Sequence, residues 1–247
     1  MTQSHVSQLV VITDAMDPIG LVSKRGIARL LLEDGSPRAS QNFHVNEACS
    51  YSYQKIRSDL SFAEAARLFE TENASCAIVS DDEQISGILT ETDLCQYFSL
   101  SSPRCLKVTD FMTTAFAHAK STYPIIHVAH MIVSSQASIP VIDEKLVGIL
   151  TLSDFLSMTD GGLDHDGKGA VAKKRDAALL PAKDLMSRRP LTVFPDDDLT
   201  EAAHIISSKQ VSALPVVDND SEVVGLLTKH DIVRAVCTFD QTPQDST

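Results

Sequence analysis

The residues best suited to chemistry form a short pattern in which a threonine precedes an aspartate by three positions. Thr228-Lys229-His230-Asp231 follows the apolar run Val223–Leu227 and begins a stretch with helical spacing. A threonine at a helix start lies beside free backbone N–H groups and the positive end of the helix dipole, where a phosphate can be held. An aspartate one turn later offers two acceptor oxygens to the paired hydroxyls of a ribose. The pattern therefore favours a nucleotide site around Thr228 and Asp231.

The same pattern recurs along the chain. Thr90-Glu91-Thr92-Asp93 and Thr151-Leu152-Ser153-Asp154 each follow a short apolar run that contains a glycine. In a decayed copy, Ser23-Lys24-Arg25-Gly26, glycine replaces the aspartate. Four copies of one element indicate a repeat architecture. Because Gly26 has no acceptor oxygen, at most three of the four repeats could hold a ribose.

Helix capping is another explanation of the pattern, because Thr or Asp near a helix start is what capping alone selects. Local charge distinguishes the copies. Repeat four adds Lys229, His230 and Arg234, and Arg188 and Arg189 precede its first strand, whereas repeats two and three lack basic residues nearby in the sequence. We therefore rank repeat four as the first candidate site, followed by repeat three and then repeat two. The same basic residues could instead form a solvated helix face.

Hydrophobic spacing predicts the elements of each repeat. Repeats two and four begin their first helices with capping-box patterns, Ser61–Glu64 and Asp198–Glu201. In each, a strand, a turn, a second strand and a closing helix follow. The first repeat reads strand, strand, helix, so its front half is missing. A missing helix leaves an apolar sheet face uncovered, and another chain, the segment 36–52 or residues of an earlier start could cover it.

The repeats predict two domains joined by short connections. The first domain, residues 1–100, contains repeat one (8–33) and repeat two (45–99). The second, residues 105–240, contains repeat three (105–157) and repeat four (182–237), with a linker at 158–181 that is rich in Gly, Asp, Lys and Ala. The length of this linker leaves other pairings of the repeats open.

The order strand-helix-strand-strand-helix resembles the cystathionine β-synthase (CBS) domain. The leader Asp184-Leu185-Met186, the strand Leu214–Val217 and the Gly-x-x-Thr-x-x-Asp ending all carry this resemblance. It implies an α/β (α+β) fold of tandem CBS repeats, β-α-β-β-α, in four copies with the first truncated. Members of the family pair two repeats into a Bateman module, whose clefts commonly bind adenosine-containing ligands.

The resemblance also implies a function. It indicates a non-catalytic regulatory protein that needs no cofactor and binds AMP, ADP or ATP, or a relative such as S-adenosylmethionine or NAD. In the family, backbone groups around the x-Pro strand clasp the adenine. The expected ligand-binding residues are Thr228, Asp231, Lys229, His230, Ala213, Leu214, Val216, Thr151, Asp154, Ile139, Thr90 and Asp93. We expect a homodimer that signals to an unidentified partner protein; the alternative is an oligomerisation scaffold without a small ligand.

Composition limits the other classes of function. The net charge of −12 over 247 residues repels phosphodiester backbones, so nucleic-acid binding is unlikely. No apolar run reaches the roughly 18 residues of a membrane span. The five cysteines have no C-x-x-C spacing and indicate reduced thiols of a cytoplasmic protein.

Three further motifs suggest chemistry only weakly. Gly162–Gly169 matches the start of a P-loop but has Gly169 where Ser or Thr would hold magnesium. The same run fails as a calcium loop, because its twelfth position is Lys173. His127 and His130 could share a metal, but no third ligand is evident. The sequence therefore predicts no metal site and no enzymatic activity.

Overall fold

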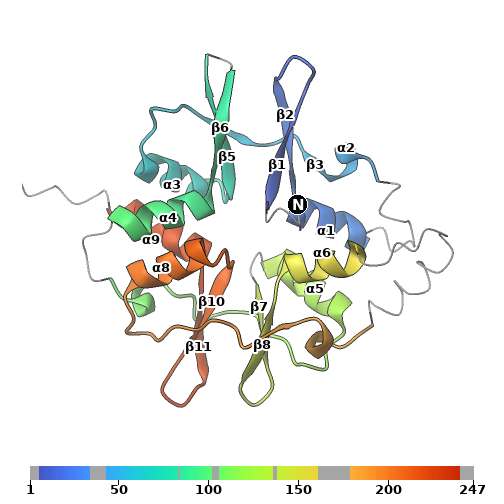
Figure 1. Ribbon diagram of the computed structural model, residues 1–247, viewed down its shortest axis with the longest axis vertical. Coiled ribbons are helices and arrows are strands. Elements are labelled where there is room, and N and C mark those ends of the chain that lie inside the picture. Colours follow the sequence, from blue (N-terminus) through green and yellow to red (C-terminus); the bar gives the residue numbers. More distant parts are fainter. Residues whose placement is uncertain are drawn as a thin grey trace, which may run out of the picture. The chain divides into compact units, whose positions relative to one another are not determined.

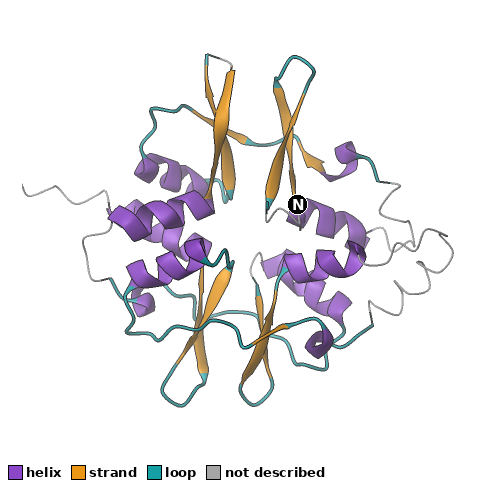
Figure 2. Cartoon of the chain, in the orientation of Figure 1, coloured by secondary structure: helices purple, strands orange, loops and turns teal. Residues whose placement is uncertain are grey.

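The computed structural model describes residues 6–33, 43–82, 84–101, 106–135, 138–160 and 179–239. Four β-hairpins, each followed by a helix, organise this part of the chain (Figures 1 and 2). Contacts divide the chain into two compact units. Unit 1 holds most of repeats one and three together with the first residues of repeats two and four, and unit 2 holds the rest of repeats two and four together with the first residues of repeat three.

Unit 1 is formed by Met1–Val11, Ile19–Tyr51 and Ala117–Pro190. Its described strands are β1 (Gln8–Ile12), β2 (Pro18–Ser23), β3 (Cys49–Ser50), β7 (Ile139–Ile142), β8 (Leu146–Leu150) and β9 (Ser187–Arg188). Its described helices are α1 (Lys24–Glu33), α2 (Val45–Ala48), α5 (Ile125–Ser135), α6 (Leu152–Asp160) and the 3-10 turn η3 (Ala182–Asp184). The strands form two sheets, with orders β1-β2-β3 and β7-β8-β9.

Unit 2 is formed by Ile12–Pro18, Ser52–Phe116 and Leu191–Thr247. Its described strands are β4 (Gln54–Ile56), β5 (Cys76–Asp81), β6 (Gln84–Thr90), β10 (Ala213–Val217) and β11 (Val223–Thr228). Its described helices are α3 (Phe62–Thr71), α4 (Glu91–Ser101), α8 (Leu199–Ser208), α9 (Lys229–Phe239) and the 3-10 turn η2 (Val108–Asp110). The sheets have orders β4-β5-β6 and β10-β11.

Helix packing holds each unit together. In unit 2, α4 lies against α8 and α9, and α3 lies against α9. The buried side chains of these helices include Phe69, Phe98, Leu94, Ile206 and Ile232. In unit 1, α1 packs on α5 and α6, with Ala28 fully buried among their side chains. The cores are aliphatic with a few phenylalanines, as expected for a chain that lacks tryptophan.

Short segments near the start of a repeat pair with the hairpin of another repeat. We call Cys49–Ser50, Met112–Thr113 and Met186–Ser187 the leader dipeptides. Ser50 lies opposite Leu21 on β2, and Ser187 lies opposite Ile149 on β8. Thr113 forms an antiparallel bridge with Leu226 on β11. The leader dipeptide at the start of repeat three therefore pairs with the hairpin of repeat four, and the one at the start of repeat four pairs with the hairpin of repeat three.

The predicted repeat order agrees with the structure in its main points. The described residues of repeat one form β1, β2 and α1, in the predicted order strand, strand, helix. Ser61 forms the predicted capping box with Glu64. Asp198 begins α8 differently, because its side chain accepts from the N–H of Thr200. Most of the linker at 158–181 lies outside the described residues, and the pairing of repeats into the two predicted domains stays a prediction.

Candidate functional site

A compact hydrogen-bonded unit, here called the Thr–Asp clasp, forms where the second hairpin strand meets the closing helix. Thr228 donates its backbone N–H and its hydroxyl to Asp231 Oδ2, at 2.7 Å and 2.6 Å. Thr151 does the same to Asp154 at 2.8 Å and 2.7 Å, and Thr90 to Asp93 at 2.8 Å and 2.6 Å. One carboxylate oxygen in each repeat therefore caps the start of the helix.

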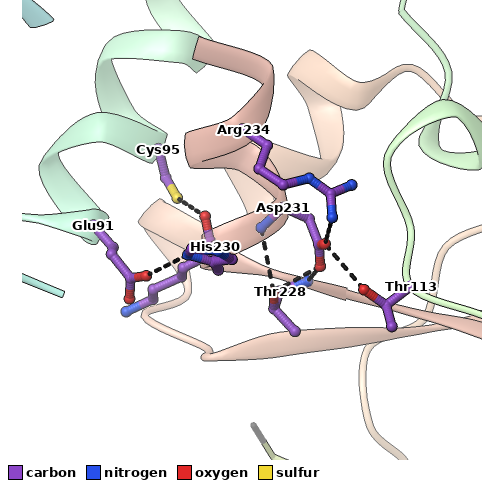
Figure 3. A network of polar contacts seen from close by, with 8 residues as sticks. Glu91, Cys95, Thr113, Thr228, His230, Asp231 and Arg234 are labelled. Carbon is purple, nitrogen blue, oxygen red and sulfur yellow. Dashed lines mark hydrogen bonds and ion pairs between the residues drawn. The ribbon is translucent and has the colours of Figure 1, made fainter. Parts of the chain in front are cut away.

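The second oxygen distinguishes repeat four from the others. Asp231 Oδ1 accepts the hydroxyl hydrogen of Thr113 at 3.1 Å and lies 3.4 Å from Arg234 Nη1 (Figure 3). Arg234 is held in turn by the carbonyl oxygen of Phe111 at 2.9 Å. Asp231 is only 2% exposed. Both carboxylate oxygens of this clasp are thus engaged within the protein, and we call it the closed clasp.

The clasps of repeats two and three are open. Within the described residues, no hydrogen bond or ion pair engages the Oδ1 atoms of Asp93 and Asp154. Asp93 is exposed and Asp154 is half-buried. A carboxylate oxygen has more than one lone pair to offer, so these two aspartates can accept hydrogen bonds from a ligand while they cap their helices.

A lysine from the other repeat of the unit reaches each open clasp. Lys229 of repeat four donates through Nζ to Thr92 Oγ1 at 2.8 Å, beside Asp93. Lys24 of repeat one donates through Nζ to Ser153 Oγ at 3.0 Å, beside Asp154. These lysines supply the positive charge that repeats two and three lack in their own sequence. Local sequence could not reveal them, because they come from 129 and 137 residues away.

The remaining basic residues of repeat four also have partners. His230 Nδ1 lies 3.6 Å from Glu91 Oε1 (Figure 3). The interaction with the Glu91 carboxylate raises the pKa of His230, with smaller contributions from the charges of Asp231 and Glu70, while partial burial acts in the opposite direction. Arg188 does not lie in the sheet of repeat four, since it pairs with Gly148 of repeat three. The basic residues that the sequence predicted at the repeat-four clasp are therefore distributed, and Lys229 lies instead at the open clasp of repeat two.

The strand residues expected to hold an adenine lie close to the clasps. Ala213 is the Cα partner of Thr228 across the β10–β11 pair, and Ile139 is the partner of Leu150, which precedes Thr151. The side chains of Ala213, Leu214, Val216 and Ile139 are all buried. Their contribution to a ligand would have to come from the backbone, in agreement with the role that the resemblance implies.

Other candidate sites gain no support. In the described part of the chain, no group of three His, Cys, Asp or Glu side chains is placed to hold a metal ion. His127 contacts the edge of the Tyr123 ring, with centroids 5.4 Å apart. The glycine-rich run Gly162–Gly169 lies outside the described residues. Among the helices described here, none has the length and apolar character needed to cross a membrane.

Comparison with protein families agrees with the repeat analysis. The model of the CBS domain matches residues 45–100, 108–160 and 182–238. The chain belongs to the CBS-domain family. These matches correspond to repeats two, three and four, and they confirm the predicted class of α/β fold with tandem CBS repeats. The predicted first repeat, at 8–33, lies outside the matched ranges.

Several known proteins resemble the chain over different lengths. The uncharacterized protein MJ1225 of Methanocaldococcus jannaschii is 26% identical over 236 residues, covering 94% of this chain and 83% of its own. A crystal structure of MJ1225 superposes with a TM-score of 0.84 at 23% identity, over 95% of this chain and 90% of that one. The chloroplastic CBS-domain protein CBSX2 of Arabidopsis thaliana is 30% identical over 126 residues, which are 44% of this chain and 53% of CBSX2.

Proposed function

We propose that this CBS protein is a non-catalytic sensor of an adenine nucleotide and that the open clasps of repeats two and three hold the ribose. The free Oδ1 atoms of Asp154 and Asp93 carry this proposal. They can accept the two ribose hydroxyls, as an acidic residue does in dinucleotide-binding folds. Asp154 is the stronger candidate, because water competes less with a ligand for its half-buried carboxylate than for the exposed carboxylate of Asp93.

The charge around the open clasps fits a phosphorylated ligand. Lys24 and Lys229 each lie one hydrogen bond from the residue that precedes the clasp aspartate. An ammonium group is a flexible point charge that can follow a phosphate oxygen over a short distance. The start of α6 or α4 adds backbone N–H groups beside the same position. These features would accommodate AMP, ADP or ATP better than an uncharged nucleoside.

The relatives support the class of ligand. CBSX2, which is 30% identical over 126 residues, has been crystallised in complex with AMP. MJ1225 has been proposed as an archaeal homologue of g-AMPK. For the present chain, binding of a nucleotide would change the packing of helices within a unit and thereby the affinity for a partner protein, which is allostery in the linked-equilibrium sense. A homodimer and a cytoplasmic location remain part of the proposal.

A thermal-shift panel tests the proposal. AMP, ADP, ATP, S-adenosylmethionine and NAD are each added to the wild-type chain. We expect at least one adenine nucleotide to raise the unfolding temperature, because a ligand that binds only the native state stabilises it. Asp154→Asn is the sharpest variant: asparagine keeps one oxygen for Thr151 but replaces the second acceptor with an NH₂ donor. We expect this variant to fold normally and to lose most of the shift.

A scaffold without a small ligand is the second candidate function. The closed clasp favours it, because both carboxylate oxygens of Asp231 have partners within the protein that serve helix capping and packing. This alternative predicts that no compound of the panel changes the unfolding temperature. It also predicts that Asp154→Asn behaves like the wild type throughout.

A further inference from the structure

Each of the four hairpins has a glycine in its second strand. At three of these glycines, a sulfur atom of another residue lies where a side chain would begin. A Cβ at Gly225 would lie 2.6 Å from Met112 Sδ, and one at Gly148 would lie 2.5 Å from Met186 Sδ. A Cβ at Gly20 would collide with Cys49 Sγ. In all three places, the absence of a side chain lets the leader dipeptide lie flat on the hairpin.

The three leader dipeptides share one register. The residue after the sulfur-bearing side chain lies opposite the residue after the glycine: Ser50 opposite Leu21, Ser187 opposite Ile149 and Thr113 opposite Leu226. In repeat four, this pairing is closed by two hydrogen bonds of 2.9 Å, from Thr113 N–H to the Leu226 carbonyl and from Leu226 N–H to the Thr113 carbonyl. We call the surface over each hairpin glycine and its following residue a seat. Each of the three occupied seats holds a Met or Cys followed by a Ser or Thr.

Gly87 of repeat two has the same seat without an occupant in the described chain. No heavy atom lies within 4 Å of a Cβ built on Gly87. The described sheet has the order β4-β5-β6, so β6 is its edge strand. Ile88, which follows Gly87, is 36% exposed, whereas its counterparts Leu21, Ile149 and Leu226 are 9%, 8% and 2% exposed.

We propose that the outer edge of β6 is a docking site for an extended segment of another polypeptide, in which Met or Cys is followed by Ser or Thr. The sulfur-bearing side chain would lie over Gly87, and the next residue would pair with the main chain of Ile88. The occupied seats on β2, β8 and β11 define this partner. A second copy of the chain could supply one of its own leader dipeptides only by removing it from β2, β8 or β11.

The physical basis is strand addition to an exposed edge. Among the described residues, no strand pairs with the outer side of β6, and the backbone N–H and C=O groups of such an edge readily take up another strand. A flexible thioether fits the shallow surface over a glycine, and burial of the side chain of Ile88 adds apolar contact. The proposal does not depend on nucleotide binding.

A peptide with the sequence of residues 106–114, which contains Met112 and Thr113, is a direct probe. It is labelled with a fluorophore and titrated with the full-length chain while the anisotropy is measured. We expect saturable binding to the wild type. Gly87→Val should weaken it about tenfold or more, because the new side chain occupies the seat. A Met112→Asp version of the peptide should bind the wild type equally poorly.

The variant is suited to this test because the space around Gly87 is open, so Gly87→Val should leave the unfolding temperature unchanged. Slower hydrogen exchange at the Ile88 amide of the wild-type chain, upon addition of peptide, supplies a second readout that needs no variant. Equal binding by the wild type and Gly87→Val, or no binding by the wild type, would overturn the proposal. A dimer that Gly87→Val abolishes would also overturn the proposal, because it assigns the edge to a second copy. Binding of the peptide only after deletion of residues 1–5 would overturn it as well, because it assigns the edge to those residues.

Discussion

Repeats two and four lie in the same unit and differ in two places that share one cause. In repeat four the clasp is closed and the hairpin glycine is covered; in repeat two the clasp is open and the glycine is bare. The leader dipeptide Met112–Thr113 makes both differences, since Met112 covers Gly225 and Thr113 donates to Asp231. Repeat three shows that the two can be separated, because its glycine is covered by Met186 while its clasp stays open. A Thr-x-x-Asp motif is thus first a helix cap, and its surroundings decide what else it can bind.

The largest expected effect comes from removal of the closed clasp. Asp231→Ala leaves the N–H of Thr228 and the hydroxyl of Thr113 without their acceptor, and it leaves Arg234 without its carboxylate. We expect a loss of about 2–3 kcal/mol in the free energy of unfolding, less than for a fully buried ion pair because Arg234 is partly exposed. The same change at the open clasp, Asp93→Ala, should lose only about 1 kcal/mol as a helix cap. Urea denaturation of both variants measures the difference, and equal losses would contradict it.

The glycines offer a second contrast. Gly20→Ala places a Cβ 2.7 Å from the carbonyl oxygen of Ser50, and a backbone atom cannot move aside as easily as a side chain. We expect this variant to lose about 1–3 kcal/mol of stability through overpacking. Gly87→Ala meets no atom within 4 Å and should be neutral. Thermal unfolding of the two variants provides the measurement, and a destabilised Gly87→Ala would show that the seat is already filled.

A third prediction concerns a variant that weakens the closed clasp of repeat four without removing its helix cap. Thr113→Val keeps the size of the side chain but deletes the hydroxyl that donates to Asp231 Oδ1. We expect a loss of about 1 kcal/mol, typical of one hydrogen bond to a charged acceptor that keeps its other partners. The control is Thr109→Val in the preceding 3-10 turn η2, where the backbone N–H of Thr109 donates to the carbonyl oxygen of Pro195. If the control lost as much stability as Thr113→Val, the effect could not be assigned to the clasp.

The smallest effect concerns pH. Glu91 raises the pKa of His230 in the folded chain, so the protonated imidazole contributes stability below its ordinary value near 6.5. That contribution is lost as the pH rises through the higher folded-state pKa. Because the pair is partly exposed, it should amount to less than about 1 kcal/mol. Comparison of wild type with Glu91→Gln between about pH 6 and pH 9 isolates it, since the variant should lack this part of the pH dependence.

Much of the fold could be predicted from the sequence because the same repeat occurs several times along the chain. The glycine, the apolar strand and the Thr-x-x-Asp ending mark three hairpins and their following helices, and the decayed ending Ser23–Gly26 marks the first. The site was harder to predict, because its character depends on contacts over long sequence distances. Thr113 lies 118 residues from Asp231, and Lys24 lies 129 residues from Ser153. The charge ranking, which placed repeat four first, stays a prediction, and the closed clasp gives a physical reason against it.

Calorimetric titration of AMP tests the central claim, that a nucleotide binds where the second oxygen of a clasp aspartate is free. Wild type, Asp154→Asn, Asp93→Asn and Asp231→Asn are compared at a temperature where all four are folded. We expect Asp154→Asn or Asp93→Asn to lose about tenfold in affinity or to lose a site, because a charged acceptor for the ribose is removed. We also expect Asp231→Asn to bind like the wild type. Binding that disappears in Asp231→Asn but is retained in the other two variants would contradict the central claim.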